Sequence, residues 1–255
     1  MKELRLIGLH SRQEVGTDMD LIQFIADLCT RQEVVLRPGD ILVLAQKIVS
    51  KSENRRVVLD EIEASPKALE MAEVSRRDAR ICELMLRESS AVVRCTPHVI
   101  IMRHKSGVVL ANAGIDRSNV EQLGERETVL LWPKNPDASA RRLHEAASRR
   151  LGFSLPVIIN DSLGRAWRRG TVGTAIGAAG LECLRDLRGK PDRHGFRLQT
   201  SELGAADEVA AAASLLMGQA DESVPAVIVR GAPVPASHSA SAADLIRAQK
   251  EDLFP

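Results

Sequence analysis

Aromatic side chains are almost absent from this chain of 255 residues. Phe, Trp and Tyr together make up 2% of the sequence, and there is no Tyr. Because proteins that bind single-stranded nucleic acid stack the bases on aromatic rings, this scarcity argues against that class. The charges nearly cancel, with 35 Lys and Arg against 34 Asp and Glu, so no net field attracts a nucleic acid or an anionic membrane. We expect an aliphatic core and small-molecule partners, with neither nucleic acid nor membrane among them.

Cysteine and long apolar runs are also scarce. The four cysteines form no CxxC pair and lie in apolar or helical surroundings, which favours buried free thiols over metal or disulfide roles. Such thiols suit a reducing compartment. No apolar run reaches the ~20 residues that a membrane-spanning helix needs, and charged residues interrupt the first fifteen positions, unlike a signal peptide. These absences predict a cytoplasmic protein.

Several common catalytic and nucleotide-binding motifs are missing. The sequence contains no GxxxxGK[ST], GxGxxG, HExxH or GxSxG pattern, and its six histidines show no metal-site spacing. Any nucleotide or metal site must therefore use a different loop design.

Short aliphatic runs alternate with amphipathic stretches along the whole chain. The runs predict strands and the stretches predict helices. The predicted strands are Leu4–Leu9, Ile41–Val49, Val99–Arg103, Val108–Asn112, Thr128–Trp132, Val157–Asn160 and Ala226–Val229. The predicted helices are Asp18–Arg31, Ser65–Arg87, Pro136–Leu151, Leu203–Met217 and Ala240–Leu253. Because the alternation is irregular and Gly107 lies between two of the strands as in a hairpin, we expect an α/β (mixed α+β) fold with mixed, partly antiparallel sheets and packed helices. Residues 1–255 then form a single unit of one domain or two intimate lobes.

The segment Asn160–Gly180 is the most unusual stretch. An apolar strand runs into Asp161 and Ser162, and arginines and four glycines follow. Carboxylates at strand ends lie where α/β sheets place ligands, and Mg²⁺ or Mn²⁺ binds carboxylate and hydroxyl oxygens. Arg165 and Arg168 offer forked donors to phosphate or carboxylate oxygens. The alternative is a solvated basic turn followed by a closely packed Gly-rich segment.

Two further segments are candidates for the same site. In Val108–Glu121 an aliphatic run leads to Asp116 and Asn119, and Asp116 could instead cap a helix near Ser118. In Gln46–Lys51, Lys51 could neutralise a polyphosphate or remain a solvated charge. Asp116 and Asp161 could meet at one metal, which the spacing alone does not decide.

Together these pieces resemble the coenzyme F420-0:L-glutamate ligase (F420 gamma-glutamyl ligase) family in its stand-alone form. The matching pieces, in family order, are Leu6-Ile7-Gly8-Leu9, Gly39-Asp40-Ile41, Val49-Ser50-Lys51, Ala113-Gly114-Ile115-Asp116, Ser118-Asn119-Val120, Asp161-Ser162-Leu163-Gly164-Arg165-Ala166-Trp167-Arg168, Gly173 to Gly177 and Ala206-Asp207-Glu208-Val209-Ala210. The resemblance implies an unusual mixed α/β fold built as a homodimer. It also implies a single catalytic unit, without the C-terminal flavin-reductase-like domain that some relatives carry.

The resemblance further implies a function. It is the GTP-dependent addition of L-glutamate, through an amide (gamma-glutamyl) bond, to the deazaflavin precursor F420-0, by way of an acyl phosphate. The implied cofactors are GTP as co-substrate, two Mg²⁺ or Mn²⁺ ions, and K⁺ as an additional candidate. A metal-dependent phosphohydrolase and a non-catalytic nucleotide-binding module are the alternatives, since both could use the same Asp pair.

Site residues follow from the resemblance position by position. It implies metal ligation by Asp116 and Asp161, with Ser162 assisting a second ion. We expect Arg165 and Arg168 to join the two aspartates in the catalytic set by holding the acceptor. The implied GTP contacts are Leu9, His10, Ser11, Arg12, Gln46, Lys51, Asn119 and Glu202.

Overall fold

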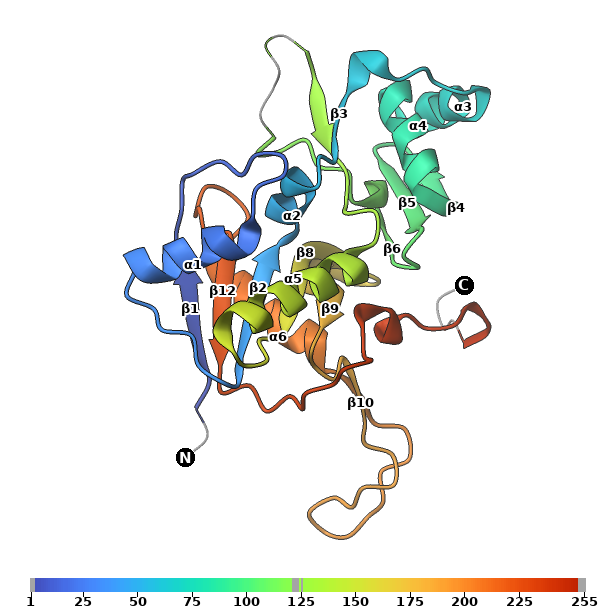
Figure 1. The fold of residues 1–255 in the computed structure, drawn as a ribbon. Helices are drawn as coiled ribbons and strands as arrows, with labels where there is room; N and C mark the ends of the chain where they lie inside the picture. The colour runs from blue at the N-terminus through green and yellow to red at the C-terminus, as the bar shows by residue number, and fades with distance from the viewer. Residues whose placement is uncertain (1–2, 121–123, 125, 252–255) are drawn as a thin grey trace.

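The computed structural model describes residues 3–120, 124 and 126–251. Its centre is a five-stranded sheet with the order β1-β12-β2-β8-β9 (Figure 1). The strands are β1 (Arg5–Leu9), β12 (Ala226–Arg230), β2 (Asp40–Ala45), β8 (Val157–Arg165) and β9 (Arg168–Ala179). β2 and β8 are parallel, and the other neighbours are antiparallel. The mixed, partly antiparallel sheet expected from the sequence is confirmed.

Alternating side chains of the sheet enter two hydrophobic clusters. Leu42 and Leu44 point to the face covered by α1 (Leu21–Arg31) and α5 (Pro136–Leu151). Ile41 and Val43 point to the opposite face, which α6 (Ala205–Met217) covers. This two-sided burial explains why the β2 run is apolar at every position rather than at every second one.

A third cluster forms the core of a smaller lobe beside the sheet (Figure 1). It is built from α3 (Pro66–Ser75), α4 (Ala79–Glu88) and a three-stranded antiparallel sheet of β4 (Ser89–Thr96), β5 (Val99–His104) and β6 (Val109–Ala111). The ribbon β3 (Arg56–Val58) with β7 (Thr128–Leu130) contributes Val129 to it. The remaining elements are α2 (Gln46–Ser52), β10 (Leu184–Asp186), β11 (Glu202–Gly204) and 3₁₀ turns at Leu59–Glu61, Asn112–Gly114, Ala242–Leu245 and Gln249–Glu251.

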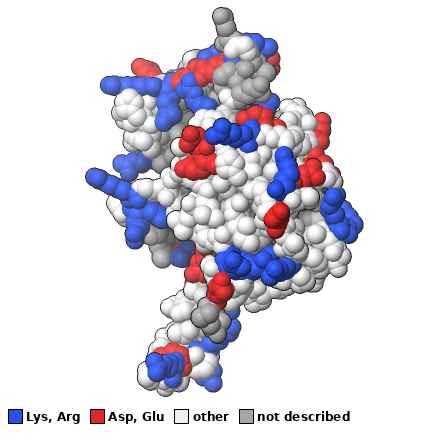
Figure 2. Space-filling model, turned by 90° about the vertical axis from the view of Figure 1, so that its left-hand side faces the viewer, with Lys and Arg blue, Asp and Glu red and all other residues white. Residues whose placement is uncertain are grey.

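An arm between β10 and β11 projects from the body of the molecule (Figure 1). Lys and Arg side chains lie among Asp and Glu both on this arm and over the face drawn in Figure 2. Cys29, Cys82 and Cys183 are buried free thiols as predicted, whereas Cys95 is half-buried. No helix within the described ranges combines the length and apolar character that a membrane span requires.

Three predicted elements differ from the structure. The strand Ile41–Val49 ends at Ala45, and α2 begins at Gln46, whose side-chain amide donates to Ser50 Oγ one turn later (2.7 Å). The helix Ser65–Arg87 is two helices, because Arg76 adopts a left-handed conformation and Asp78 caps α4. The final helix Ala240–Leu253 is replaced, as far as residue 251, by the two short 3₁₀ turns. The other predicted elements are found within a few residues of their expected bounds.

The Gly-rich segment after Asp161 is not a loop but a long antiparallel hairpin of β8 and β9. Two of its glycines allow helices to lie directly on the strand. A Cβ at Gly177 would lie 2.4 Å from the Pro136 carbonyl oxygen, and one at Gly173 would lie 2.6 Å from the Ala210 carbonyl oxygen. Close packing against α5 and α6 therefore explains these two glycines.

Candidate functional site

A cavity of about 540 Å³ opens at the end of the sheet where β2 stops. Ala45, the last residue of β2, pairs with Asn160 of β8 at this edge. Crevices beyond the carboxyl ends of parallel strands are the usual ligand sites of α/β sheets. Five segments line the cavity: residues 11–15, 45–51, 116–119, 160–162 and 217–225. The tertiary structure thus brings the three segments that the sequence singled out into one place.

Asp116 and Asp161 both line this cavity. Asp116 is held by two backbone hydrogen bonds with Leu130, each 2.9 Å long. Asp161 lies in β8, where its Oδ1 accepts from the Ser162 amide (2.7 Å) and its Oδ2 from the Trp132 indole Nε1 (2.7 Å). Burial raises the pKa of both carboxyls, and the nearby charge of Asp116 helps to raise the pKa of Asp161 to about 6. The two carboxylates therefore lie near enough for their charges to repel each other.

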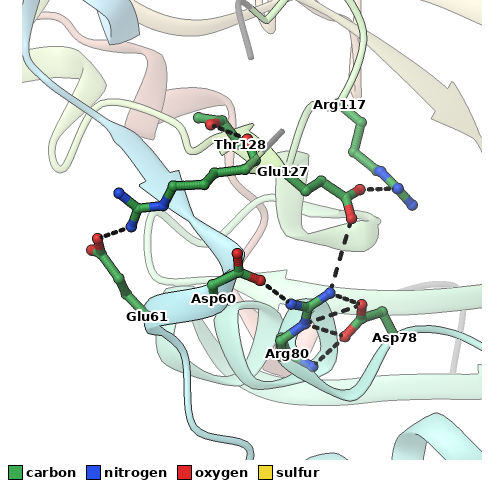
Figure 3. A network of polar contacts seen from close by, with 8 residues as sticks. Asp60, Glu61, Asp78, Arg80, Arg117, Glu127 and Thr128 are labelled. Atoms are coloured by element: carbon green, nitrogen blue, oxygen red, sulfur yellow. Dashed lines mark hydrogen bonds and ion pairs between the residues drawn. The ribbon is translucent and has the colours of Figure 1, made fainter. Parts of the chain in front are cut away.

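Ion pairs in the smaller lobe anchor the segment that carries Asp116 (Figure 3). Arg117, the next residue, pairs with Glu127. Glu127 lies 3.9 Å from Arg80, which also binds Asp78 and Asp60 at 2.7 Å. The backbone that follows Asp116 is thus connected through Glu127 to Arg80 of α4.

Lys47 is the cation nearest to Asp116. Its Nζ lies 3.4 Å from Asp116 Oδ1 and donates to the carbonyl and hydroxyl oxygens of Ser118. This charge lowers the pKa of Asp116 against the larger effect of burial. The resemblance to the family implied a nucleotide contact for Lys51 and none for Lys47. Both lysines lie in the helix α2, not at the end of a strand as expected.

Three buried oxygen atoms of cavity-lining residues are of the kind that a hard divalent cation binds. Asp116 Oδ2, Asn160 Oδ1 and Gln46 Oε1 are buried and have no hydrogen-bond partner in the described part of the chain. Buried acceptors are normally satisfied, and carboxylate and amide oxygens are the ligands that Mg²⁺ and Mn²⁺ prefer. Among residues 3–120, 124 and 126–251, no group of three or more His, Cys, Asp or Glu could hold a metal. Amide, hydroxyl, water or phosphate oxygens would therefore have to complete the coordination shell.

Several predicted nucleotide contacts also line the cavity. They are Ser11, Arg12, Gln46, Lys51 and Asn119, and the predicted metal-assisting residue Ser162 lies with them. Lys51 is buried and donates to Glu14 Oε2 (2.6 Å), whose side chain is exposed. These positions agree with a shared site, and the roles given to the residues remain predictions.

The loop between α6 and β12 was missed by the sequence reasoning. The side-chain amide of Gln219 donates to Ser162 Oγ (2.6 Å). The loop also accepts two hydrogen bonds, from the Asn119 side-chain amide to the Ala220 carbonyl (3.2 Å) and from the Ser11 backbone amide to the Ser223 carbonyl (2.8 Å). The one feature of the sequence that could have indicated this loop is its position just before the predicted strand Ala226–Val229. Since β12 runs antiparallel to β2, its first residues lie at the edge where β2 ends.

Five predicted site residues lie outside this cavity. Leu9 is fully buried in the core, and the backbone of His10 is bonded to the Gln32 side chain. Arg165 and Arg168 are exposed at the turn of the β8–β9 hairpin, and Glu202 in β11 pairs with Arg188 (3.3 Å). Their predicted roles are therefore not supported by a place in the cavity.

The pKa of Asp161 predicts how the stability of the metal-free protein varies with pH. Folding raises this pKa from 3.8 to about 6, so between these values the folded protein binds more protons here than the unfolded chain does. The free energy of unfolding should therefore fall as pH rises from about 4 to about 6, by at most about 3 kcal/mol from this group. Urea titrations of wild type and Asp161→Asn should show that the variant loses this pH dependence. Equal slopes in the two proteins would contradict the prediction.

The sequence of this chain is similar to those of one family of known proteins. The family model described as F420-0:Gamma-glutamyl ligase matches residues 11–231. The chain is 42% identical over 230 residues to the coenzyme F420:L-glutamate ligase of Methanothermobacter thermautotrophicus, covering 90% of each chain. It is 41% identical over 219 residues to the ligase of that name from Methanococcus maripaludis strain C6, covering 86% of each. It is 37% identical over 239 residues to that of Methanocaldococcus jannaschii, covering 94% of this chain and 91% of the relative.

Proposed function

This chain belongs to the F420-0:gamma-glutamyl ligase family, and from that premise we propose that it ligates L-glutamate to F420-0 with GTP as the co-substrate. The relatives that bear the name of this ligase match it over most of their length. The main observation in favour of the proposal is that Asp116 and Asp161 line the same cavity as Lys47. A cavity of about 540 Å³ lies within the range of about 300–1,000 Å³ that small-molecule sites occupy.

The triphosphate of GTP is proposed to lie among the cationic and amide groups of the cavity. Lys51 and Arg12 would neutralise phosphate charge, and Asn119 and Gln46 would offer amide groups. Lys51 is buried and its partner Glu14 is exposed, so a phosphate could replace Glu14 with little rearrangement. This part of the proposal concerns positioning, which is the main task of a protein in phosphoryl transfer.

Asp116 and Asp161 would hold a first Mg²⁺ or Mn²⁺ ion, and Ser162 would assist a second. When bound, such ions would neutralise the charge that develops on the phosphate oxygens. Two observations favour cation binding here: Asp116 Oδ2 has no partner in the part of the chain that the structure describes, and the pKa of Asp161 is raised. K⁺ stays an additional candidate, with no residue assigned to it.

The proposed chemistry proceeds in two steps. A carboxylate oxygen of F420-0 attacks the γ-phosphorus of GTP, the bond to the β-phosphate oxygen breaks, and GDP leaves. The amine of glutamate then attacks the acyl carbon of the acyl phosphate, loses a proton, and expels inorganic phosphate. No side chain has to act as a covalent nucleophile, so the protein needs only to orient the substrates and offset their charge.

Arg165 and Arg168 stay in the proposal as contacts for the anionic acceptor. They are exposed at the tip of the β8–β9 hairpin, beside Trp167, whose side chain is 90% exposed. A homodimer of this chain is part of the same proposal, because exposed residues of one copy could then meet the substrate of the other.

The test is incubation of the purified protein with F420-0, L-glutamate, GTP and Mn²⁺. A product heavier than F420-0 by one glutamyl residue, and GDP release that requires both F420-0 and glutamate, would support the ligase. GDP release without the acceptor would instead identify a phosphohydrolase. Nucleotide binding with neither product nor GDP would identify a non-catalytic binding module. Replacing GTP by ATP tests the choice of base.

A further inference from the structure

Trp132, between β7 and α5, is fully buried, and its ring contacts Asp161 of the candidate site. The indole has a single polar group, the Nε1–H, which donates to Asp161 Oδ2 at 2.7 Å. The backbone of Trp132 is also fixed, because Arg55 Nε donates to its carbonyl oxygen at 2.7 Å. The indole N–H that donates to Asp161 therefore belongs to a residue whose ring and backbone are both hydrogen-bonded.

The same ring supports the segment that leads to Asp116. At Gly114, a Cβ would lie 2.4 Å from the indole Nε1 and 2.5 Å from Cε2. Gly114 also has a φ of +70°, a conformation that other residues rarely adopt, so this close approach of backbone to ring is specific to glycine. The indole thus lies between the backbone before Asp116 and the carboxylate of Asp161.

A buried histidine also packs on the ring. His104 packs on Trp132 with the ring centroids 4.9 Å apart and the planes at 56°. Its Nδ1 accepts from the Ser106 amide (3.0 Å), and burial lowers its pKa, which favours the neutral ring. The contacts with His104 and Gly114 restrict rotation of the indole and keep its N–H directed at Asp161.

We propose that Trp132 is a positioning residue whose indole N–H fixes the carboxylate of Asp161 in the orientation that binds the divalent cation. This inference rests on the proposed function only in assuming that a cation binds at Asp161. Without the indole N–H, the carboxylate would be left, within the described ranges, with the hydrogen bond from the Ser162 amide to Oδ1, and the charge of Asp116 would favour a rotation of Oδ2 away from the cavity. The Trp132 hydrogen bond occupies one lone pair of Oδ2, and the Ser162 amide occupies one of Oδ1, so that each oxygen keeps a lone pair for the cation, in the manner of the partners that orient metal ligands.

Trp132→Phe removes the N–H and keeps most of the ring. The expected result is a 10- to 100-fold weaker affinity for Mn²⁺ (about the loss that orienting partners of metal ligands produce), measured by calorimetry or electron paramagnetic resonance on the protein alone. Trp167→Phe is the matched control, because Trp167 is the other tryptophan of the sequence and is exposed on the hairpin. It should bind Mn²⁺ as the wild type does. Equal affinities in all three proteins would overturn the proposal.

Fluorescence provides a test that does not depend on the folding of Trp132→Phe. In Trp167→Phe, Trp132 is the sole tryptophan, so its emission reports on the surroundings of Asp161. Mn²⁺ should change that emission, and Asp161→Asn in the same background should abolish the response. An emission unchanged at saturating Mn²⁺ would overturn the proposal.

The inference and the proposed function fail in different ways. A wild type that makes no glutamyl product while Trp132→Phe still weakens Mn²⁺ binding would leave the positioning role standing without the ligase. A wild type that makes the product while Trp132→Phe binds Mn²⁺ normally would leave the ligase standing and remove the positioning role. In the expected case, product formation by Trp132→Phe recovers as Mn²⁺ is increased, since the defect lies in metal affinity.

Discussion

Asp116→Asn is expected to reduce glutamate ligation by more than about 100-fold while leaving the metal-free protein at least as stable as the wild type. The loss follows because Asp116 would supply one of two charges that hold the cation. The retained stability follows because Asp116 Oδ2 has no partner among the described residues, and because the charge of Asp116 raises the pKa of Asp161. Removing that charge relieves repulsion between two buried carboxylates.

Two measurements on the same sample check this expectation. Product mass at saturating GTP and Mn²⁺ gives the activity, and thermal unfolding in chelator at pH 8 gives the stability. Asp186→Asn is the control, because Asp186 is exposed at the end of β10 and far in the sequence from any residue that lines the cavity. Full activity in Asp116→Asn would remove the proposed function. Lost activity together with lost stability would make Asp116 a structural residue.

Arg230→Leu is expected to lower the free energy of unfolding by about 3 kcal/mol, with little effect on the site itself. Arg230 binds Asp40 through two hydrogen bonds, from Nε to Oδ1 and from a terminal nitrogen to Oδ2, both 2.7 Å. The Asp40 side chain is only 1% exposed, and without Arg230 it keeps, within the described residues, one hydrogen bond, from the Arg37 amide. An uncompensated buried charge at the start of β2 destabilises the central sheet.

Arg188→Leu is the matched control for this substitution. Arg188 makes the same two-pronged contact with Asp186, but both side chains are about half exposed, so its loss should change the urea midpoint little. The double variant Asp40→Asn with Arg230→Leu should recover part of the stability, because no buried charge remains unpaired. Equal decreases in the free energy of unfolding for Arg230→Leu and Arg188→Leu would contradict the prediction, because burial of the ion pair would then make no difference to its contribution.

Many of the elements followed from local patterns in the sequence, whereas the strands β3, β4, β9, β10 and β11 were not predicted. Asn135 before Pro136 and Gly152 after Leu151 bound α5 as predicted, since capping depends on a few neighbouring residues. The hairpin of β5 and β6 was found for the same reason, with Gly107 at a φ of +94°. The start of α2 was missed, because the residues from Ile41 to Val49 are apolar enough for either a strand or a helix.

The sequence by itself named Asp116 and Asp161 as acidic residues that follow apolar strands, and it identified the family they resemble. Only the tertiary structure decided that they share a cavity, because that depends on the pairing of β2 with β8 and of Asp116 with Leu130, between residues far apart in the chain. It also decided that Gln219 meets Ser162 and that Trp132 meets Asp161. Local propensity acts over a few residues, whereas burial and charge in a cavity depend on every segment that the fold brings to it.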